Sequence, residues 1–312
     1  MTHPEPQTTD TAHATKGERL SAEIRSHVER LSAELAKGKT EELVNYLKAM
    51  GQFHHYSWGN VLLIFMQRPD AGRVAGFHAW KKFGRHVKKG AKGISILAPI
   101  VRKGEENGET VRRVVAVKGA TVFSEHDTEG DPLPTLDITS AQGGTPELLH
   151  RVIATAAQTF PIEYKDLGGP VGITDGRVIY LDSMKCDADP GTALTTLFHE
   201  WAHCVLHVRE GQRTEEAQGK SHALIELEAE SAAFVLSALH GVDTLPSTNN
   251  YIQTYGANPE RLFGALESIG HAVRTIMKAL RPEAFDEEEQ SRGRADAARK
   301  SAHKRHQGRR AA

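Results

Sequence analysis

Two histidines and a glutamate with a spacing that suits metal chemistry occur in HEWAHCVLH, residues 199–207. On a helix, residues four apart share a face with their Cβ atoms about 5–6 Å apart, so His199 and His203 can reach one zinc ion. Glu200 is rotated by about 100° from His199, which suits a carboxylate that accepts a proton from water at the metal. Because the chain has 17 histidines, this spacing also arises by chance, and a zinc site needs a third ligand.

A carboxylate-bearing helix is predicted in SHALIELEAESAAFVLSALHG, residues 221–241. At about 100° per residue, Glu226 and Glu230 fall on one narrow stripe of a helix that is otherwise mostly apolar. Buried carboxylates need a partner, and a metal with its histidines is a natural one. The alternative is that both carboxylates pair with Arg or Lys of a neighbouring helix. Glu228 points about 160° away from Glu226 and is expected in solvent or in a salt bridge.

Two further residues of the first motif are expected to play no part at the metal. His207 continues the four-residue series but lies one turn too far along for the same ion, so we expect it at the surface. Cys204 directly follows a ligand position and points off the metal-facing side, which predicts a packed thiol.

A basic segment in the first half contains six positive residues within twelve and no acid. They are Lys81, Lys82, Arg85, Lys88, Lys89 and Lys92. Such residues release counterions from a phosphate backbone, and single strands also stack their bases on aromatic rings. Trp80 and Phe83 fit a core as well as a stacking role, whereas Tyr56 and Trp58 are expected to be exposed. The alternative for the lysines is a solvated turn.

Hydrophobic periodicity predicts the elements that position these groups. Helices are predicted over 17–35, from Glu41, at FHAWKKF, from 146, from about Thr192, over 221–241 and over 260–280. Strands are predicted at 94–103 and 112–123 around the turn signal GEENGE, and at 176–182. The predicted fold class is therefore α+β, with a small α+β domain followed by a mainly helical one.

Composition predicts the segments that separate and flank these domains. We predict a disordered segment 1–17, a first domain 18–135, a linker 136–146, a second domain 147–282 and a charged disordered tail 283–312. The net charge of −1 indicates no particular partner. Two cysteines fit a reducing compartment, and no apolar run is long enough for a signal peptide or a bilayer span, so we expect a cytoplasmic protein with no membrane contact.

The zinc motif resembles a known family when it is read together with the E-L-E-A-E helix that follows it. The pair is similar to the gluzincin-type metallopeptidase domain of ArdC-like antirestriction proteins and their ImmA/IrrE relatives. The resemblance implies that Glu226 is the third zinc ligand and that Glu230 is an outer carboxylate that orients a ligand histidine. Glu200 would be the catalytic base. The segment after Cys204 departs from the family pattern, which affects the substrate cleft rather than the metal.

The first half resembles the N-terminal single-stranded-DNA-binding domain of the same family. The similar stretches are Tyr56-Ser57, Asn60-Val61-Leu62-Leu63, the RVAGFHAW turn that begins at Arg73, and KKGAKGISILAP. The predicted DNA contacts are Tyr56, Trp58, Arg73, Trp80, Lys81, Lys82, Arg85, Lys88, Lys89 and Lys92.

The predicted function is that of a single-stranded-DNA-binding protein with a Zn²⁺ metallopeptidase-like domain that protects the DNA of a mobile element from restriction. One alternative is a regulatory metalloprotease, similar to ImmA/IrrE, that cleaves a DNA-bound repressor as its protein substrate. Another is a DNA-binding module with non-catalytic zinc. The presence of Glu200 favours a catalytic capacity, because a structural zinc site has no use for a base beside the metal. Whether the peptidase is active is left open.

Overall fold

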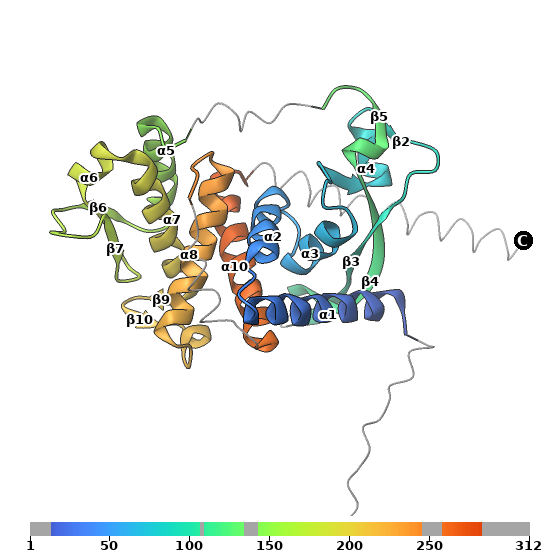
Figure 1. Ribbon diagram of the computed structural model, residues 1–312, viewed down its shortest axis with the longest axis horizontal. Coiled ribbons are helices and arrows are strands. Elements are labelled where there is room, and N and C mark those ends of the chain that lie inside the picture. Colours follow the sequence, from blue (N-terminus) through green and yellow to red (C-terminus); the bar gives the residue numbers. More distant parts are fainter. Residues whose placement is uncertain (1–13, 107–108, 134–142, 245–257, 283–312) are drawn as a thin grey trace, which may run out of the picture. The chain divides into compact units, whose positions relative to one another are not determined.

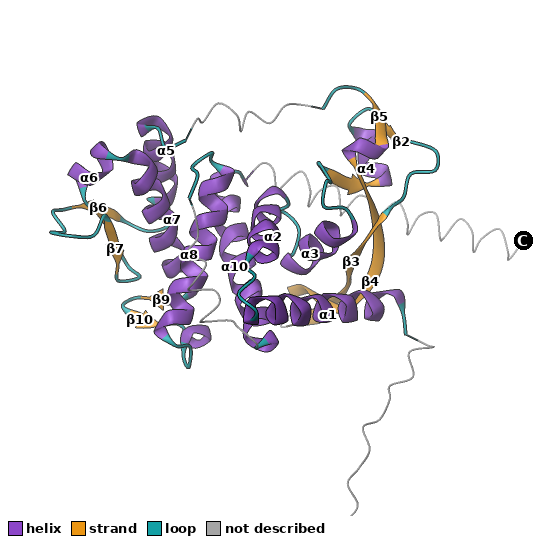
Figure 2. Ribbon diagram, in the orientation of Figure 1, coloured by secondary structure: helices purple, strands orange, loops and turns teal. Residues whose placement is uncertain are grey.

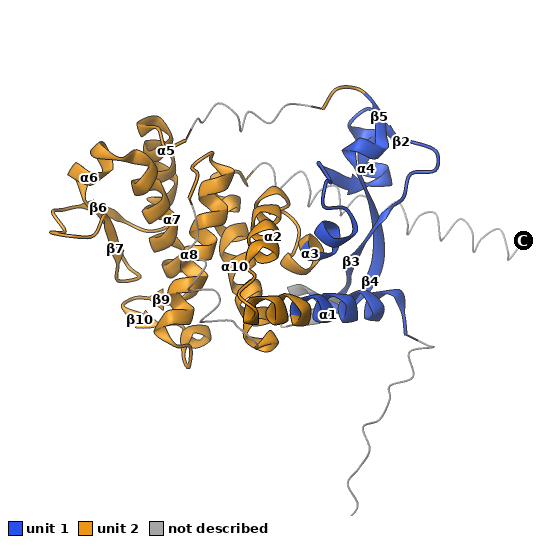
Figure 3. Ribbon diagram, in the orientation of Figure 1, with its two compact units in different colours: residues 1–28, 62–130 blue, residues 29–61, 131–312 orange. Residues whose placement is uncertain are grey.

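The computed structural model describes residues 14–106, 109–133, 143–244 and 258–282. Helices and small sheets alternate over these residues, which confirms the predicted α+β class (Figures 1 and 2). The chain forms two compact units: unit 1 joins residues 1–28 to 62–130, and unit 2 joins residues 29–61 to 131–312 (Figure 3). No helix in the described ranges has the length and apolar character needed to cross a membrane.

Unit 1 is built around a long antiparallel hairpin. Its elements are the first part of α1 (Lys16–Ala36), the last part of α3 (Trp58–Gln67), β1 (Val74–Gly76), α4 (Phe77–Lys82), β2 (Arg85–Val87), β3 (Ile94–Glu106), β4 (Glu109–Ser124), the 3-10 helix η2 (Glu125–Asp127) and β5 (Thr128–Gly130). The sheet order is β1-β4-β3, and β2 pairs separately with β5. The predicted strands and the hairpin between them are confirmed.

The core of unit 1 follows from the apolar spacing of its elements. Leu20 and Ile24 of α1 are buried, as their helical periodicity predicts, and so are alternate residues of the hairpin such as Ile94 and Ile96. Trp80 of α4 is also buried, and its ring Nε1 donates a hydrogen bond of 3.0 Å to the carbonyl of Phe123. This bond satisfies the polar end of the indole and fixes α4 against β4.

Unit 2 is mainly helical, as predicted. Its elements are the rest of α1, α2 (Glu41–Gln52), the start of α3, α5 (Pro146–Ala156), β6 (Ile162–Tyr164), β7 (Gly172–Thr174), β8 (Ile179–Leu181), α6 (Ser183–Ala188), α7 (Pro190–Leu206), β9 (Val208–Arg209), β10 (Gln212–Arg213), the 3-10 helix η3 (Glu215–Ala217), α8 (His222–Leu239) and α10 (Pro259–Leu280). Helix α8 packs against α2, α7 and α10, while β7 and β8 contact α7. The sheet beside α7 has the order β6-β8-β7.

Local capping signals set the start of the two helices that carry the candidate site. The Asp189 side chain accepts a hydrogen bond of 3.0 Å from the Thr192 backbone N–H at the start of α7. Ser221 caps α8 through the Leu224 backbone N–H at 3.3 Å, as predicted. Gly241, with φ of 73°, follows the end of α8, in agreement with the predicted glycine stop.

Residues 29–61 pack with unit 2, whereas the sequence placed them in the segment 18–135. Helix α2 lies against α8, and a Cβ atom at Gly51 would be only 3.1 Å from the Leu239 side chain. The Tyr46 hydroxyl donates a hydrogen bond of 2.8 Å to the Trp58 carbonyl, which links α2 to the start of α3. The bounds of separately folding domains remain a prediction. Most of the predicted linker, the predicted tail and residues 1–13 lie outside the described residues.

Replacing Gly130 by alanine should lower the free energy of unfolding by about 3 kcal/mol, because both its backbone and its surroundings exclude a side chain. Its φ is 135°, and a Cβ atom there would meet the carbonyl oxygen of Gly84. Gly90 is the matched control, with φ of 86° but open space around it, and Gly90→Ala should cost about 1 kcal/mol. Denaturant unfolding measures both, and equal losses would contradict this description of the β2–β5 pair.

Candidate metal centre and basic segment

Helices α7 and α8 bring His199, His203 and Glu226 to one point. One ligand atom from each residue lies within 4.8 Å of the others. The two histidine Nε2 atoms are 2.9 Å apart, and the Glu226 carboxylate oxygens lie 3.5 Å from His199 Nε2 and 3.6 Å from His203 Nε2. The three side chains that the sequence singled out as ligands therefore converge, two from α7 and one from α8.

The charges of this cluster suit a divalent cation. The neighbouring His199 and His203 rings hold the pKa of Glu226 far below its usual range, although burial opposes this, so the carboxylate is ionised. Burial lowers the pKa of His199, but the hydrogen bond to Glu226 and the charge of Glu200 outweigh it and raise that pKa overall. Catalytic zinc sites use two imidazole nitrogens and one carboxylate as protein ligands and leave a fourth position for water or substrate. His199, His203 and Glu226 form such a donor set.

Glu200 is half-buried beside the cluster, next to His199 on α7. Burial raises the pKa of its carboxyl group, with a smaller contribution from the charge of Glu226, and His199 opposes the shift. The backbone N–H of Thr174, on strand β7, donates a hydrogen bond to this carboxylate. Strand β7 thereby holds Glu200 in place, and the raised pKa brings the group closer to the range in which it can exchange a proton.

Glu230 lies with His199 on the wall of an open pocket of about 220 Å³. The other lining residues are Thr195, Thr196, Ala233, Phe234 and Thr244. The negative charge of Glu230 contributes to the raised pKa of His199. Its assignment as the carboxylate that orients a ligand histidine remains a prediction.

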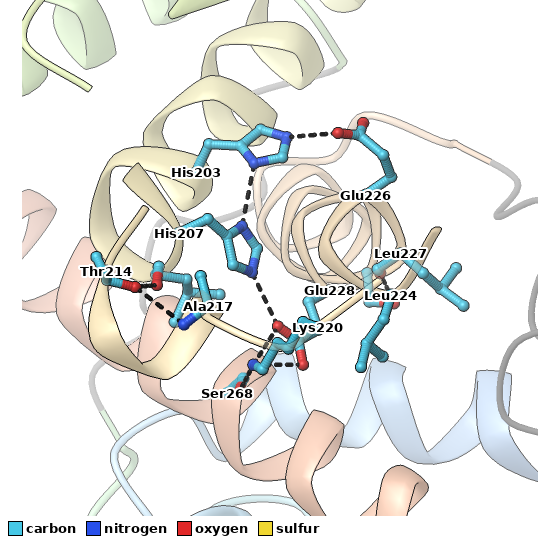
Figure 4. A network of polar contacts seen from close by, with 12 residues as sticks. His203, His207, Thr214, Ala217, Lys220, Leu224, Glu226, Leu227, Glu228 and Ser268 are labelled. Carbon is cyan, nitrogen blue, oxygen red and sulfur yellow. Dashed lines mark hydrogen bonds and ion pairs between the residues drawn. The ribbon is translucent and has the colours of Figure 1, made fainter. Parts of the chain in front are cut away.

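His207 differs from its predicted position, and Glu228 matches one of the two positions predicted for it. His207 is 0% exposed, so the prediction of a surface residue is wrong. Helix α7 ends at Leu206, and the His207 ring is directed into the interior between the end of α7 and helix α8 (Figure 4). Glu228 is also 0% exposed, which excludes the solvated position, and it forms the salt bridge that was the other expectation, with Lys220 at 2.8 Å.

These two residues belong to a buried polar network that sequence reasoning missed. His203 Nδ1 lies 3.0 Å from His207 Nδ1, and His207 Nε2 lies 2.8 Å from Glu228 Oε2 (Figure 4). The one sequence feature that could have indicated this network is Lys220, a basic residue directly before the N-cap of an apolar helix.

Cys204 is buried as predicted, and burial raises the pKa of its thiol to about 11.

The basic segment in unit 1 divides into exposed and engaged residues. Lys81, Lys82, Lys88, Lys89 and Lys92 are exposed. Arg85 donates hydrogen bonds to the Thr128 hydroxyl at 2.8 Å and to the Thr128 carbonyl at 3.1 Å, and Lys88 Nζ donates to the His126 carbonyl at 3.1 Å. Arg85 therefore also joins β2 to β5, and Lys88 joins the end of β2 to η2. Arg73 is half-exposed, and its carbonyl accepts a bond of 2.7 Å from the Glu125 N–H.

The aromatic residues predicted to stack on bases are largely inside the protein. Tyr56 is buried, so the expectation that it is exposed is wrong, and Trp80 is a core residue. Trp58 is half-buried, with its ring edge-to-face on Phe263 at 4.7 Å. The exposed rings beside the lysines are instead Phe77 at 43% and Phe83 at 47%. Sequence reasoning missed Phe77, whose one signal was its place at the start of α4.

The fold and the convergent cluster define an α+β protein with a candidate metal centre on two packed helices. Residues 16–123 match the family model described as the N-terminal domain of anti-restriction factor ArdC. This part of the chain is therefore similar to the N-terminal domain of that family. The matched segment ends before the helices of the candidate metal centre.

Other known proteins resemble the chain more distantly. An uncharacterised protein of Bacillus anthracis is 24% identical over 289 residues, which cover 77% of this chain and 48% of that protein. The chain thus spans about half the length of the curated relative it matches. The crystal structure of the antirestriction ArdC protein from the R388 plasmid has a TM-score of 0.46 at 20% identity in its metal-free form, covering 72% of this chain and 85% of that one. Its Mn(II)-bound form has a TM-score of 0.49 at 19% identity, covering 82% and 97%.

Proposed function

We propose that this protein binds single-stranded DNA through unit 1, holds a divalent metal ion in unit 2, and protects the DNA of a mobile element from restriction. Zinc is the metal we expect, and peptide hydrolysis is the chemistry we expect at that site. The observation that carries the proposal is the convergence of His199, His203 and Glu226 within 4.8 Å, with Glu200 beside them. The match of residues 16–123 to the ArdC N-terminal domain supports the DNA-protection role.

The residues around the metal position supply what a hydrolytic site needs. A divalent ion held there would act as a Lewis acid and lower the pKa of water. Glu200 is placed to take a proton from the attacking water and to return it to the leaving group, and its raised pKa makes the carboxylate a stronger base for the first step. Thr174 keeps the carboxylate oriented through its backbone N–H.

A peptide substrate is favoured by the strand next to the site. Strand β7 is at the edge of the β6-β8-β7 sheet and contacts α7, which carries Glu200. An extended peptide can pair with an edge strand through backbone hydrogen bonds. Such pairing would lay the peptide along β7, whose Thr174 binds the proposed base.

The proposed chemistry is tested by comparing the metal-loaded protein with its Glu200→Gln variant in host lysate, with metal content measured in both. Glutamine keeps the shape of the side chain but cannot accept the proton, so we expect equal metal content and cleavage only by the unchanged protein. A Glu200-dependent cut in a DNA-bound host regulator would favour the regulatory protease. Identical peptides in both samples would assign the metal a non-catalytic role.

The DNA-binding part of the proposal is supported by the exposed residues of α4 and the following turn. Lys81 Nζ lies 5.2 Å from the centre of the Phe77 ring, and Phe83 packs on Trp80 at 6.1 Å with nearly half of its surface open. Exposed rings next to lysines match the combination that single-stranded nucleic acid requires, namely a stacking surface and charge. We assign the stacking role to Phe77 and Phe83 in place of Tyr56 and Trp80.

The contributions of charge and of stacking to DNA affinity should be distinguishable when the affinity is measured at several salt concentrations. Because each lysine releases about 0.7 of a counterion from a single strand, the double variant Lys89→Gln/Lys92→Gln should reduce the salt slope by about 1.4. Phe83→Ala should weaken binding by about 1–3 kcal/mol with the slope nearly unchanged, since stacking releases no counterions.

The matched control is Lys48→Gln/Lys278→Gln, two exposed lysines on helices of unit 2, which should leave the slope as it is. Full-length protein is used throughout, so that the charged C-terminal segment contributes equally to every variant. If both double variants lower the slope by the same amount, the basic segment has no special part in binding.

A further inference from the structure

A chain of buried polar contacts runs from the candidate metal centre to Lys220. His203 Nδ1 is 3.0 Å from His207 Nδ1, His207 Nε2 is 2.8 Å from Glu228 Oε2, and Lys220 Nζ is 2.8 and 2.9 Å from the two Glu228 oxygens (Figure 4). Lys220 also donates to the Ser268 hydroxyl of α10 at 3.2 Å. His203, His207 and Glu228 are all buried.

The direction of each hydrogen bond follows from the groups at its ends. Lys220 donates two hydrogen bonds to the Glu228 carboxylate, and a carboxylate paired with an ammonium group accepts hydrogen bonds, so His207 Nε2 is the donor to Glu228. His207 therefore carries its proton on Nε2. An imidazole that carries its one proton on Nε2 has a lone pair on Nδ1, so Nδ1 of His207 is an acceptor.

The lone pair on His207 Nδ1 determines where the His203 ring carries its proton. His203 must donate from Nδ1, because His207 Nδ1 has no proton to give. A neutral His203 then has a lone pair on Nε2, the atom that lies 2.9 Å from His199 Nε2 and 3.6 Å from a Glu226 oxygen. The proton in the contact between the two ligand histidines belongs to His199.

We propose that His207, held by Glu228 and Lys220, is a positioning residue that fixes the tautomer and ring orientation of His203, so that Nε2 of His203 is available as a metal ligand. The proposal rests on the metal centre proposed above, but it concerns the protein before any metal binds. It assigns to a second histidine and its carboxylate the orienting role that the sequence had given to Glu230. Helix α10 takes part through Ser268.

The tautomer is read directly by nitrogen NMR of the histidine rings in metal-free protein at a pH where they are neutral, with the His203 signals identified by their loss in His203→Gln. We expect a proton on Nδ1 of His203, the less common tautomer of free histidine. In His207→Leu the proton should move to Nε2. An Nε2 proton on His203 in the unchanged protein would overturn the proposal, even if the variants fail to fold.

Metal affinity gives a second test, in which one variant of His207 should lose affinity and another should keep it. In His207→Leu the affinity for Zn²⁺ should fall by about 10- to 100-fold, the usual effect of removing an outer partner. In His207→Asn the side-chain oxygen can take the place of Nδ1 as acceptor, so affinity should stay within a few-fold of the original. Equal losses in the two folded variants would mean that His207 only fills space. The predicted tautomer in a protein that binds no metal would instead refute the proposed metal centre and leave only the assignment of the His203 tautomer to His207.

Discussion

Replacing Glu226 by alanine should abolish stoichiometric metal binding, with the metal content of the purified protein falling from one Zn²⁺ per chain to background. The reason is that Glu226 is the one carboxylate that lies within 3.6 Å of both histidine Nε2 atoms among the described residues. Two imidazoles alone leave a divalent ion without the anionic ligand that such sites use. Atomic emission or a chromogenic chelator measures the content after dialysis.

The matched control is Glu267→Ala, which removes an exposed glutamate from α10 and should leave one ion per chain. Circular dichroism must show that both variants keep their helices. Full metal content in the Glu226→Ala protein would remove this residue from the site and leave the resemblance to gluzincins without its third ligand.

The second large effect should come from Glu228. Its removal by Glu228→Ala leaves the Lys220 ammonium and the buried His207 ring without their acceptor, so we expect a loss of about 3–5 kcal/mol in the free energy of unfolding. Denaturant unfolding of the metal-free protein measures it, which separates stability from metal affinity. The exposed Glu216 provides the control, and Glu216→Ala should change stability by less than about 0.5 kcal/mol.

A double variant tests whether the loss comes from an unpaired charge. Lys220→Met/Glu228→Leu removes both members of the pair and fills their volume with apolar groups, so it should be less destabilised than Glu228→Ala alone. If the double variant loses as much stability as Lys220→Met and Glu228→Leu lose when added together, Glu228 contributes through packing and not through charge pairing.

Much of the fold could be predicted because its signals are local. The periodic leucines of α1, the cap at Ser221 and the pairing of β3 with β4 each depend on residues that are near one another in the sequence, and all three predictions are confirmed. The short strands β6 and β7 were missed, since three-residue strands have too few positions to display an alternation. The packing of residues 29–61 with unit 2 was also missed, because it depends on contacts of α2 with a helix far along the chain.

The candidate site, like the fold, was predicted correctly in some residues and wrongly in others. The spacing of His199 and His203 on one helix face, together with the stripe that carries Glu226, was enough to predict their convergence. His207 was misplaced, because its ring lies at the end of α7, where the regular 100° step no longer applies. Tyr56 was misplaced because exposure depends on which elements cover a residue, and an aromatic ring near a helix start carries no local signal of that.

The most direct test of the metal centre is a crystal of the protein soaked in Zn²⁺ and measured on both sides of the zinc absorption edge. The anomalous difference density should show one peak per chain, bounded by His199 Nε2, His203 Nε2 and the Glu226 carboxylate, with Glu200 beside it and not bound. A peak at other residues, or no peak at a zinc concentration well above micromolar, would contradict the metal centre on which the proposed function depends.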